Sequence, residues 1–249
     1  MQIIGHRGAM GYKPENTISS FEEALSLGVD GIELDVWKCR SGELVVFHDE
    51  TLDKLTNGSG SIYDKTLSEL KKLEVKHPAP EKGETIPHEN ITIPTLDEVL
   101  DVVDKTAFVN VELKGPNTAR LVYGTIEKYV LENGWPYDGF LVSSFDHPEL
   151  RKFQKASRGT INVGYLFSAI PLLYAKLAER AGAHAIHPEW DTLNKRLVSD
   201  AHKRRIKVNV WTVNTEEQAR KMVKLGVDGL FTNYPDKMRE WVAKYNAEL

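Results

Sequence analysis

The stretch LGVDGIEL at residues 27–34 returns as LGVDGLFT at residues 225–232, and a looser copy, AGAHAIHP, occupies residues 181–188. The first two copies follow amphipathic stretches with helical spacing and lead into apolar runs. Gly28 and Gly226 stand where a helix would end, a position that favours the left-handed conformation of glycine. A helix, a glycine stop and a buried strand form the repeating unit of a parallel sheet, so this stretch predicts an α/β fold.

Eight strands of this kind are expected, and most are continuous apolar runs, as in sheets that helices cover. They span roughly 2–6, 31–36, 108–113, 140–144, 161–167, 184–188, 207–213 and 229–232. The expected helices span 17–27, 95–104, 117–132, 146–156, 169–181, 195–204, 215–225 and 236–246. Eight βα units in 249 residues predict a (β/α)₈ TIM barrel, with residues 1–249 as a single domain.

A doubly wound open sheet is the alternative arrangement of the same units. Its glycine-rich nucleotide fingerprint is missing, because neither GHRGAMG (5–11) nor GSGSIY (58–63) matches it, and there is no Walker A sequence. The barrel is therefore the preferred prediction.

One region departs from the βα repeat, directly after the second strand. The chain reads VWKCRSGELVVFHDETL at 36–52, and Ser41 and Gly42 are a plausible tight turn between two strand-like runs. Residues 44–48 are then expected to return antiparallel to 31–38, with His48 opposite Asp35. Residues 50–94 are expected to form a polar insertion beside the barrel mouth. It would hold one short helix near LSELKKL (67–73) and no core of its own.

Composition narrows the class of protein. With 41% hydrophobic and 27% charged residues, the chain has the profile of a soluble globular protein. A net charge of −4 argues against a general nucleic-acid binder, and the single cysteine, Cys39, excludes an intrachain disulfide and a Cys-rich metal site. No signal peptide and no membrane-length apolar run is recognised, so a cytoplasmic location without stable membrane insertion is expected. The oligomeric state stays open.

Three acids stand at alternating positions in otherwise apolar strands: Glu33 and Asp35 in GIELDVW, and Glu112 in FVNVELK. Side chains two apart on a strand share a face, so Glu33 and Asp35 point the same way. Buried carboxylates are costly unless a positive charge compensates them. A divalent cation bound by oxygen ligands is one such compensation, and simple pairing with Lys or Arg is the other.

Polar residues also end the other strands, which is where TIM barrels carry their catalytic groups. His6 and His48 are interpreted together as catalytic, although each alone fits a structural histidine. Ser143 and Ser144 are interpreted as structural, because no His–Asp relay can be assigned to them. The remaining polar strand-end residues are Arg7, Lys114, His187, Glu189 and Trp211.

Short motifs along the chain, in the order in which they occur, resemble those of the glycerophosphodiester phosphodiesterase family. The resemblance spans nearly the whole sequence. The motifs are HRG (6–8), PENT (14–17), ELDV (33–36), HD (48–49), IPTLDEVL (93–100), VELK (111–114), VWTVN (210–214) and GVDGLFTNYP (226–235).

The resemblance implies a TIM barrel with a small insertion after the second strand. It implies an enzyme that hydrolyses glycerophosphodiesters to an alcohol and glycerol 3-phosphate, with one divalent cation, Mg²⁺ or Ca²⁺. Matched motif to motif, Glu33, Asp35 and Glu112 would be the metal ligands, and His6 and His48 the general acid and base. Arg7 and Lys114 would then hold the phosphate, and Trp211 would lie along the substrate.

Two other functions remain open from the sequence. A lysophospholipase D-like phosphodiesterase would use the same site but needs a route for an acyl chain, and the insertion shows no apolar lid. A catalytically silent barrel that only binds phosphodiesters is the other, and it would be expected to have lost an acid or a histidine. Which histidine is the acid, and whether the nucleophile is water or the neighbouring glycerol hydroxyl, also stays open at this point.

Overall fold

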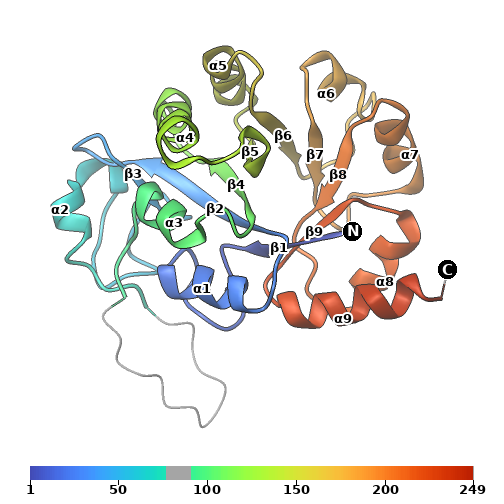
Figure 1. Cartoon of the computed structure of the whole chain (residues 1–249), viewed down its shortest axis with the longest axis horizontal. Helices are drawn as coiled ribbons and strands as arrows, with labels where there is room; N and C mark the ends of the chain where they lie inside the picture. The colour runs from blue at the N-terminus through green and yellow to red at the C-terminus, as the bar shows by residue number, and fades with distance from the viewer. Residues whose placement is uncertain (77–90, 249) are drawn as a thin grey trace, which may run out of the picture.

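The computed structural model describes residues 1–76 and 91–248, and its centre is a closed parallel barrel (Figure 1). The strands pair in the order β1-β9-β8-β7-β6-β5-β4-β2, and pairing of β1 with β2 closes the ring. The predicted (β/α)₈ barrel is therefore confirmed. The barrel strands are β1 (Gln2–His6), β2 (Gly31–Lys38), β4 (Phe108–Leu113), β5 (Phe140–Ser144), β6 (Asn162–Phe167), β7 (Ala185–Pro188), β8 (Lys207–Val210) and β9 (Gly229–Thr232).

Helices surround the barrel, and several of them begin at residues whose side chains cap them. Thr95 and Thr215 each accept from the backbone N–H three residues on, while Glu98 and Gln218 reach back to the cap, which forms two capping boxes. Gly226 ends one helix with φ 72°, the left-handed conformation expected there. The helices are α1 (Ile18–Ser26), α3 (Leu96–Val103), α4 (Ala119–Asn133), α5 (His147–Ser157), α6 (Lys176–Arg180), α7 (Lys195–Lys203), α8 (Glu216–Leu225) and α9 (Pro235–Asn246), and the 3₁₀ turn η2 spans Tyr137–Gly139.

One predicted helix is largely wrong. Residues 169–181 were expected to be helical, but only Lys176–Arg180 forms α6. Pro171 disfavours the helical conformation in the residue before it and offers no N–H to a helix. Tyr174 then takes a positive φ of 48°, which interrupts a right-handed helix. A loop from residue 168 to residue 175 therefore leads from β6 to α6.

The hairpin after β2 is confirmed, but its register differs from the prediction by one residue. β3 (Leu44–Val46) runs antiparallel to β2, and Val36 pairs with Val46. The backbone N–H of Phe47 donates to the carbonyl of Asp35 at 3.0 Å, so Phe47, not His48, stands opposite Asp35. The turn contains three residues, 40–42, because Cys39 N–H already pairs with the carbonyl of Glu43. Gly42, at φ 107°, supplies the left-handed residue that such a loop needs.

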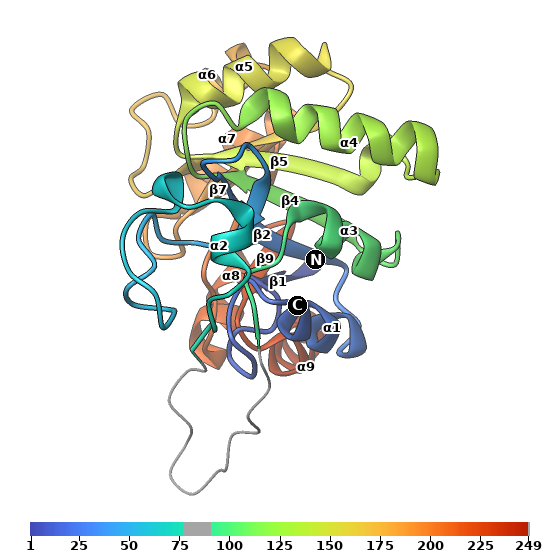
Figure 2. The same ribbon diagram turned by 90° about the vertical axis from the view of Figure 1, so that its left-hand side faces the viewer.

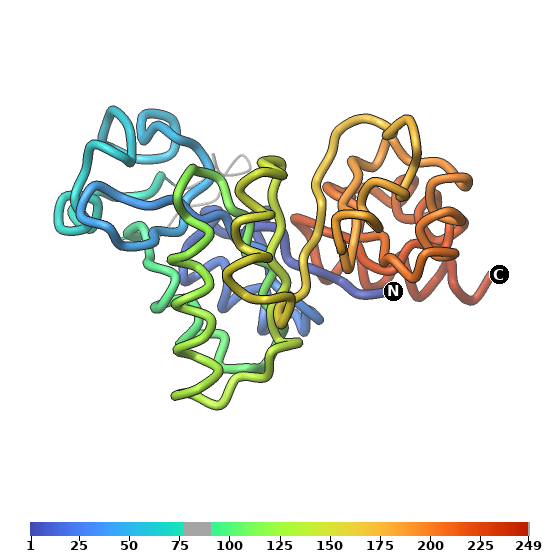
Figure 3. The backbone as a smooth tube through the Cα atoms, turned by 90° about the horizontal axis from the view of Figure 1, so that it is seen from above, coloured from blue at the N-terminus to red at the C-terminus, as the bar shows by residue number. Residues whose placement is uncertain are grey.

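The predicted insertion was given as residues 50–94, of which 77–90 lie outside the described residues. The described part contains the 3₁₀ turn η1 (Ile62–Asp64) and the expected short helix, α2 (Leu67–Leu70). Its buried side chains, among them Leu52 and Ile62, form an apolar cluster together with Trp37 and Phe47 of the hairpin region. The insertion thus shares a core with the hairpin, and Figures 2 and 3 show the two side by side at one end of the molecule.

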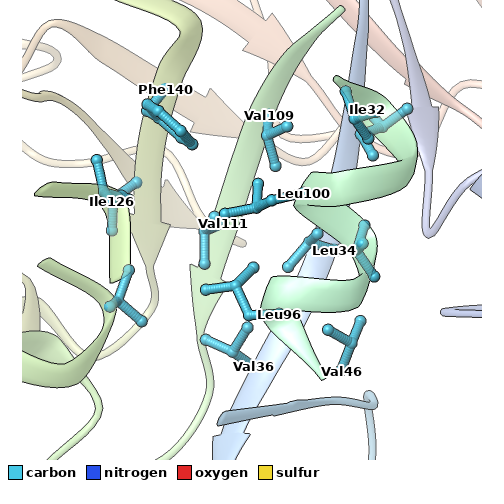
Figure 4. Close-up of a cluster of buried hydrophobic side chains, with 14 of the residues drawn as sticks. Ile32, Leu34, Val36, Val46, Leu96, Leu100, Val109, Val111, Ile126 and Phe140 are labelled. Atoms are coloured by element: carbon cyan, nitrogen blue, oxygen red, sulfur yellow. The ribbon is translucent and has the colours of Figure 1, made fainter. Parts of the chain in front are cut away.

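Alternation along β2 decides what each of its faces meets. The even residues point outward into the largest apolar cluster, against α3 and its neighbours, and Figure 4 shows this packing. The odd residues, Glu33 and Asp35, therefore point into the barrel. Apolar contact with α3 fixes the register of β2, and so fixes where its two acids lie. The packed side chains labelled there include Ile32, Leu34, Val36, Leu96, Leu100, Val109 and Val111.

Within the part of the chain that the structure describes, no helix is both long and apolar enough to cross a bilayer.

Candidate active site

A pocket of about 430 Å³ opens at the barrel end where the parallel strands terminate. The structure brings seven of the eight predicted site residues to its lining. The eighth, Asp35, lies within reach of two of them, Arg7 and Lys114. The seven lining residues are His6, Arg7, Glu33, His48, Glu112, Lys114 and Trp211.

The three acids lie together as the strand alternation predicts. Carboxylate oxygens of Glu33, Asp35 and Glu112 all fall within 4.8 Å of one another, and all three side chains are buried. Asp35 and Glu112 are direct partners across the β2–β4 ladder, which explains their closeness. Burial, reinforced by the charge of Asp35, raises the pKa of Glu33 well above its usual range and that of Glu112 to about 7.

Two cations and one amide partly offset this negative charge at Asp35. Its carboxylate lies 3.3 Å from Nε of Arg7 and 3.7 Å from Nζ of Lys114, and it accepts from Nδ2 of Asn16 at 2.9 Å. Burial alone would raise the pKa of Asp35, but the charges of Arg7 and Lys114 outweigh it and lower that pKa. Asn16 belongs to the PENT motif, so this contact had a sequence signal that was not interpreted.

Arg7 and Lys114 are each held in place by a carboxylate. Nη1 of Arg7 donates to Glu15 at 2.7 Å, and its backbone N–H donates to Glu33 at 2.9 Å. Nζ of Lys114 donates to Glu112 at 3.0 Å. Both cationic side chains line the pocket, so their positive charge is available to an anion that enters it.

The two predicted histidines line the same pocket but come from different segments, His6 from the end of β1 and His48 from the HD motif after β3. His6 ends β1, and its Nδ1 lies 2.8 Å from Oδ1 of Asn233. Burial and the nearby charge of Arg7 lower the pKa of His6 to about 3. Nδ1 of His48 lies 2.6 Å from a carboxylate oxygen of Asp49. Neither partner was predicted, although Asn233 and Asp49 both stand inside the quoted motifs.

An apolar wall completes the pocket. The ring of Trp211 meets that of Phe145 edge to face at 5.5 Å, and its Nε1 donates to the carbonyl of His187 at 2.8 Å. Phe145 is 46% exposed and was not predicted, since an aromatic residue in a loop carries no periodic signal. The pocket therefore has a charged side and an aromatic side, which suits a ligand with an anionic group and an organic part.

The remaining strand-end residues have packing partners. Ser144 donates to the carbonyl of Leu113 at 2.7 Å, and Ser143 accepts from Asn110 at 3.0 Å. His187 is fully buried beneath the pocket, and burial lowers its pKa to about 3. Gly164 makes room for it, because a Cβ there would lie 2.4 Å from the His187 ring.

The chain is similar to known proteins over nearly its whole length. The model of the glycerophosphoryl diester phosphodiesterase family matches residues 6–237. A glycerophosphodiester phosphodiesterase from Caldanaerobacter subterraneus subsp. tengcongensis is 37% identical over 97% of this chain and 98% of the relative. Another, from Bacillus altitudinis, is 37% identical over 95% of this chain and 96% of the relative. Among solved structures, an Oleispira antarctica phosphodiesterase in complex with the product sn-glycerol-3-phosphate aligns with a TM-score of 0.85 at 32% identity, over 98% of this chain and 97% of that chain.

Proposed function

The chain belongs to the glycerophosphoryl diester phosphodiesterase family of enzymes, and from that premise we propose that it hydrolyses glycerophosphodiesters to an alcohol and glycerol 3-phosphate. The observation that carries the proposal is one pocket that joins three clustered carboxylates, two cations and two histidines. We take residues 1–249 to act as one catalytic domain.

The acid cluster fits a divalent cation. Burial and, after it, the negative charge of Asp35 raise the pKa values of Glu33 and Glu112, and a doubly positive ion beside the three carboxylates would favour their ionised forms. All three candidate ligands offer oxygen atoms, which suits Mg²⁺ or Ca²⁺ and does not suit a soft metal that prefers sulfur ligands. Glu33, Asp35 and Glu112 would hold the ion. When bound, it supplies positive charge and Lewis acidity to a phosphodiester.

Arg7 and Lys114 complete the charge balance around the phosphodiester. Both are positioned by carboxylates in the site, so little side-chain entropy is lost when an anion arrives. A phosphodiester carries one negative charge, shared by its two non-bridging oxygens. Further negative charge develops on the phosphoryl and leaving oxygens as the reaction proceeds. Two fixed cations stabilise that developing charge more than they stabilise the ground state.

The hydrogen-bond partners of the histidines support a proposal for which is the base and which the acid. An amide oxygen only accepts, so Nδ1 of His6 donates to Asn233 and Nε2 keeps its lone pair, as a general base requires. Nδ1 of His48 lies 2.6 Å from a carboxylate oxygen of Asp49, which orients that ring, and we give His48 the role of the general acid. His6 therefore takes the proton of the attacking hydroxyl, and His48 gives a proton to the alkoxide oxygen as its bond to phosphorus breaks.

The attacking hydroxyl has two sources, water and the neighbouring hydroxyl of the glycerol group. Attack by the glycerol hydroxyl expels the alcohol and forms a cyclic phosphate. In a second step, water hydrolyses this cyclic phosphate to glycerol phosphate. Brief incubation and phosphorus NMR distinguish the two, because only the glycerol route accumulates a cyclic phosphodiester.

The experiment that tests the function is a hydrolysis panel. Purified protein is incubated with glycerophosphocholine, glycerophosphoethanolamine or glycerophosphoglycerol, each with Mg²⁺, with Ca²⁺ and with EDTA, and release of glycerol 3-phosphate is followed. Release that EDTA abolishes is the expected result. Release of choline from lysophosphatidylcholine, with no glycerol 3-phosphate released from the panel, would favour the lysophospholipase D-like function. Metal-induced thermal stabilisation without any release would favour a silent binding barrel.

A further inference from the structure

The loop between β6 and α6, together with the start of α6, exposes an unusual amount of apolar surface. Ile170, Leu172, Leu173 and Leu177 are each more than two-fifths exposed, and Leu172 is 94% exposed. We name the segment that carries these four side chains, from the end of β6 to the start of α6, the leucine loop. Other exposed large hydrophobic residues among those described are scattered singly, which is ordinary for a soluble surface. A cluster of this kind marks an interaction site.

Contacts with α7 and its apolar cluster hold the C-terminal part of the leucine loop in place. The backbone N–H of Ala175 donates to Asp200 on α7 at 3.0 Å, and Ala175 itself is buried. Tyr174 packs against the apolar cluster that α7 and α8 share, and its positive φ turns the chain there. The backbone that follows Leu172 is thus held, while the Leu172 side chain is exposed to solvent.

The loop also adjoins the mouth of the active-site pocket. It leaves the carboxyl end of β6, and all parallel strands of the barrel end at that same face. In Figure 2 it lies on the same side of the molecule as the insertion. Half-exposed Phe145 belongs to the pocket lining and extends the apolar surface from the pocket toward the next loop.

A cationic groove lies on the neighbouring loops and helices. It has a volume of about 1170 Å³ between α7 and α8 and contains four cations against one acid, Glu217. Within the described residues, none of the four takes part in an ion pair, although Nζ of Lys221 lies 5.3 Å from the ring of Trp190. The four cations are Lys195, Arg220, Lys221 and Lys224.

Backbone contacts connect the cationic groove to the leucine loop. Glu189 N–H donates to the carbonyl of Phe167, where that loop begins, at 3.3 Å. Trp190 N–H donates to the carbonyl of Trp211 at 2.8 Å, which ties the groove to the pocket wall. Apolar side chains and a half-buried tryptophan therefore lie on neighbouring loops at one end of the barrel. Lys195 at the start of α7 and Lys221 of α8, which lies over Trp190, are the cations beside them.

We propose that this face docks on the surface of an anionic lipid bilayer, with the leucine loop in the interface and the cationic groove against acidic head groups. Exposed leucines beside lysines and a tryptophan are the composition of interfacial membrane binding. Lysines near an acidic leaflet are attracted by its negative surface potential. Docking would place the pocket mouth at the membrane, and it goes beyond the proposed hydrolysis, because neither element lies among the groups assigned to the reaction.

Flotation with vesicles tests the apolar part of the proposal. Wild-type protein is expected to float with vesicles of phosphatidylcholine mixed with phosphatidylglycerol and to float much less with phosphatidylcholine alone. The double variant Leu172→Ser, Leu173→Ser should lose about tenfold in vesicle affinity. Leu131→Ser is the matched control, because Leu131 is 72% exposed but lies near the C-terminal end of α4, at the other end of the barrel. Equal flotation of the double variant and the wild type would overturn the proposal.

A charge pair of variants tests the cationic part. Lys195→Glu, Lys221→Glu should weaken binding to the acidic vesicles, and added salt should weaken wild-type binding in the same way. Lys155→Glu, an exposed lysine near the C-terminal end of α5, should leave it unchanged. Binding that ignores both the charge reversal and salt would overturn the assignment of acidic lipid.

Hydrolysis of water-soluble glycerophosphocholine separates this proposal from the proposed function. The leucine variants should retain wild-type turnover on it, since neither side chain lines the pocket. If they bind vesicles normally but fail only on monomeric lysophosphatidylcholine, the loop takes an acyl chain and the docking proposal fails. Vesicle binding by a protein that hydrolyses nothing would leave docking supported and the enzymatic proposal refuted.

Discussion

Nδ1 of His6 lies 2.8 Å from Oδ1 of Asn233, although 227 positions separate the two residues in the sequence. The contact exists because β1 pairs with β9, the step that joins the first and last strands of the barrel. His6 ends β1, and Asn233 directly follows β9. Closure of the barrel therefore creates the hydrogen bond that orients the proposed base.

Asn233→Asp tests this relationship through the pH profile. A carboxylate beside Nδ1 stabilises the imidazolium, so the pKa of His6 should rise and the acidic limb of kcat/KM should move to higher pH. The measurement is kcat/KM against pH with glycerophosphocholine. Asn162→Asp, at the start of β6 and the other end of the barrel, is the control and should leave the profile in place. An unmoved acidic limb in Asn233→Asp contradicts the assignment.

His6→Ala and His48→Ala should each lower kcat by roughly 10²–10⁴-fold, the usual contribution of a general acid or base. Because each ring makes one hydrogen bond at the edge of a pocket, the fold should survive. Steady-state kinetics with circular dichroism checks both points. His202→Ala, a partly exposed histidine on α7, should keep near-normal turnover. Near-normal turnover in either pocket variant would remove that histidine from the mechanism.

Glu33→Gln should stabilise the metal-free protein and reduce its stabilisation by Mg²⁺ or Ca²⁺. The amide keeps an acceptor for the Arg7 N–H and replaces a buried acid whose raised pKa makes its ionised form costly in the folded state. Thermal unfolding with and without the ion measures both effects.

Glu149→Gln is the contrasting control for that experiment. Glu149 is also buried, but it accepts from Ala119 N–H at 3.0 Å and pairs with Lys152 at 2.7 Å. Loss of those charged hydrogen bonds should lower the melting temperature and leave the metal-induced shift intact. A melting temperature of metal-free Glu33→Gln below that of the wild type contradicts the cost assigned to ionised Glu33.

The contribution of Glu112 to the stability of the metal-free protein should fall as pH rises from about 4.5 to about 7. Burial raises the folded pKa of Glu112 from 4.5 to about 7, so the folded state holds this proton more tightly than the unfolded chain does. The associated stability is present below pH 4.5 and is lost as pH rises through the folded pKa. Chemical unfolding across this range, with Glu112→Gln for comparison, measures the effect. The variant should lack that part of the pH dependence, and an identical dependence in both proteins contradicts the assignment.

Phe145→Ala should raise KM for glycerophosphodiesters by roughly fivefold with little change in kcat, as expected for loss of one aromatic contact of about 1 kcal/mol. Phe145 is half-exposed and packs on Trp211, so its loss should not unfold the barrel. Tyr137→Ala, an exposed aromatic in the turn before β5, is the control. A fall in kcat with unchanged KM would show that Phe145 acts on the transition state instead.

Most of the barrel was predictable because its signals are local. Apolar runs, glycine stops and threonine caps each act within a few residues, and the observed strands lie within three residues of their predicted bounds. The two wrong details are also local. The hairpin turn holds three residues, with Gly42 in the left-handed region, and not two. Pro171 and the positive φ of Tyr174 removed most of one predicted helix.

The sequence by itself determined that the three acids lie together. Alternation in an apolar strand was sufficient to predict that Glu33 and Asp35 share a face, and parallel strands brought Glu112 beside them. Only the tertiary structure decided which partner each group has. The contacts of His6 with Asn233 and of Asp35 with Asn16 depend on barrel closure and on loop conformation. The physical reason is that side-chain periodicity reports a residue's face, while a hydrogen bond requires two atoms within about 3 Å, which only the packed chain specifies.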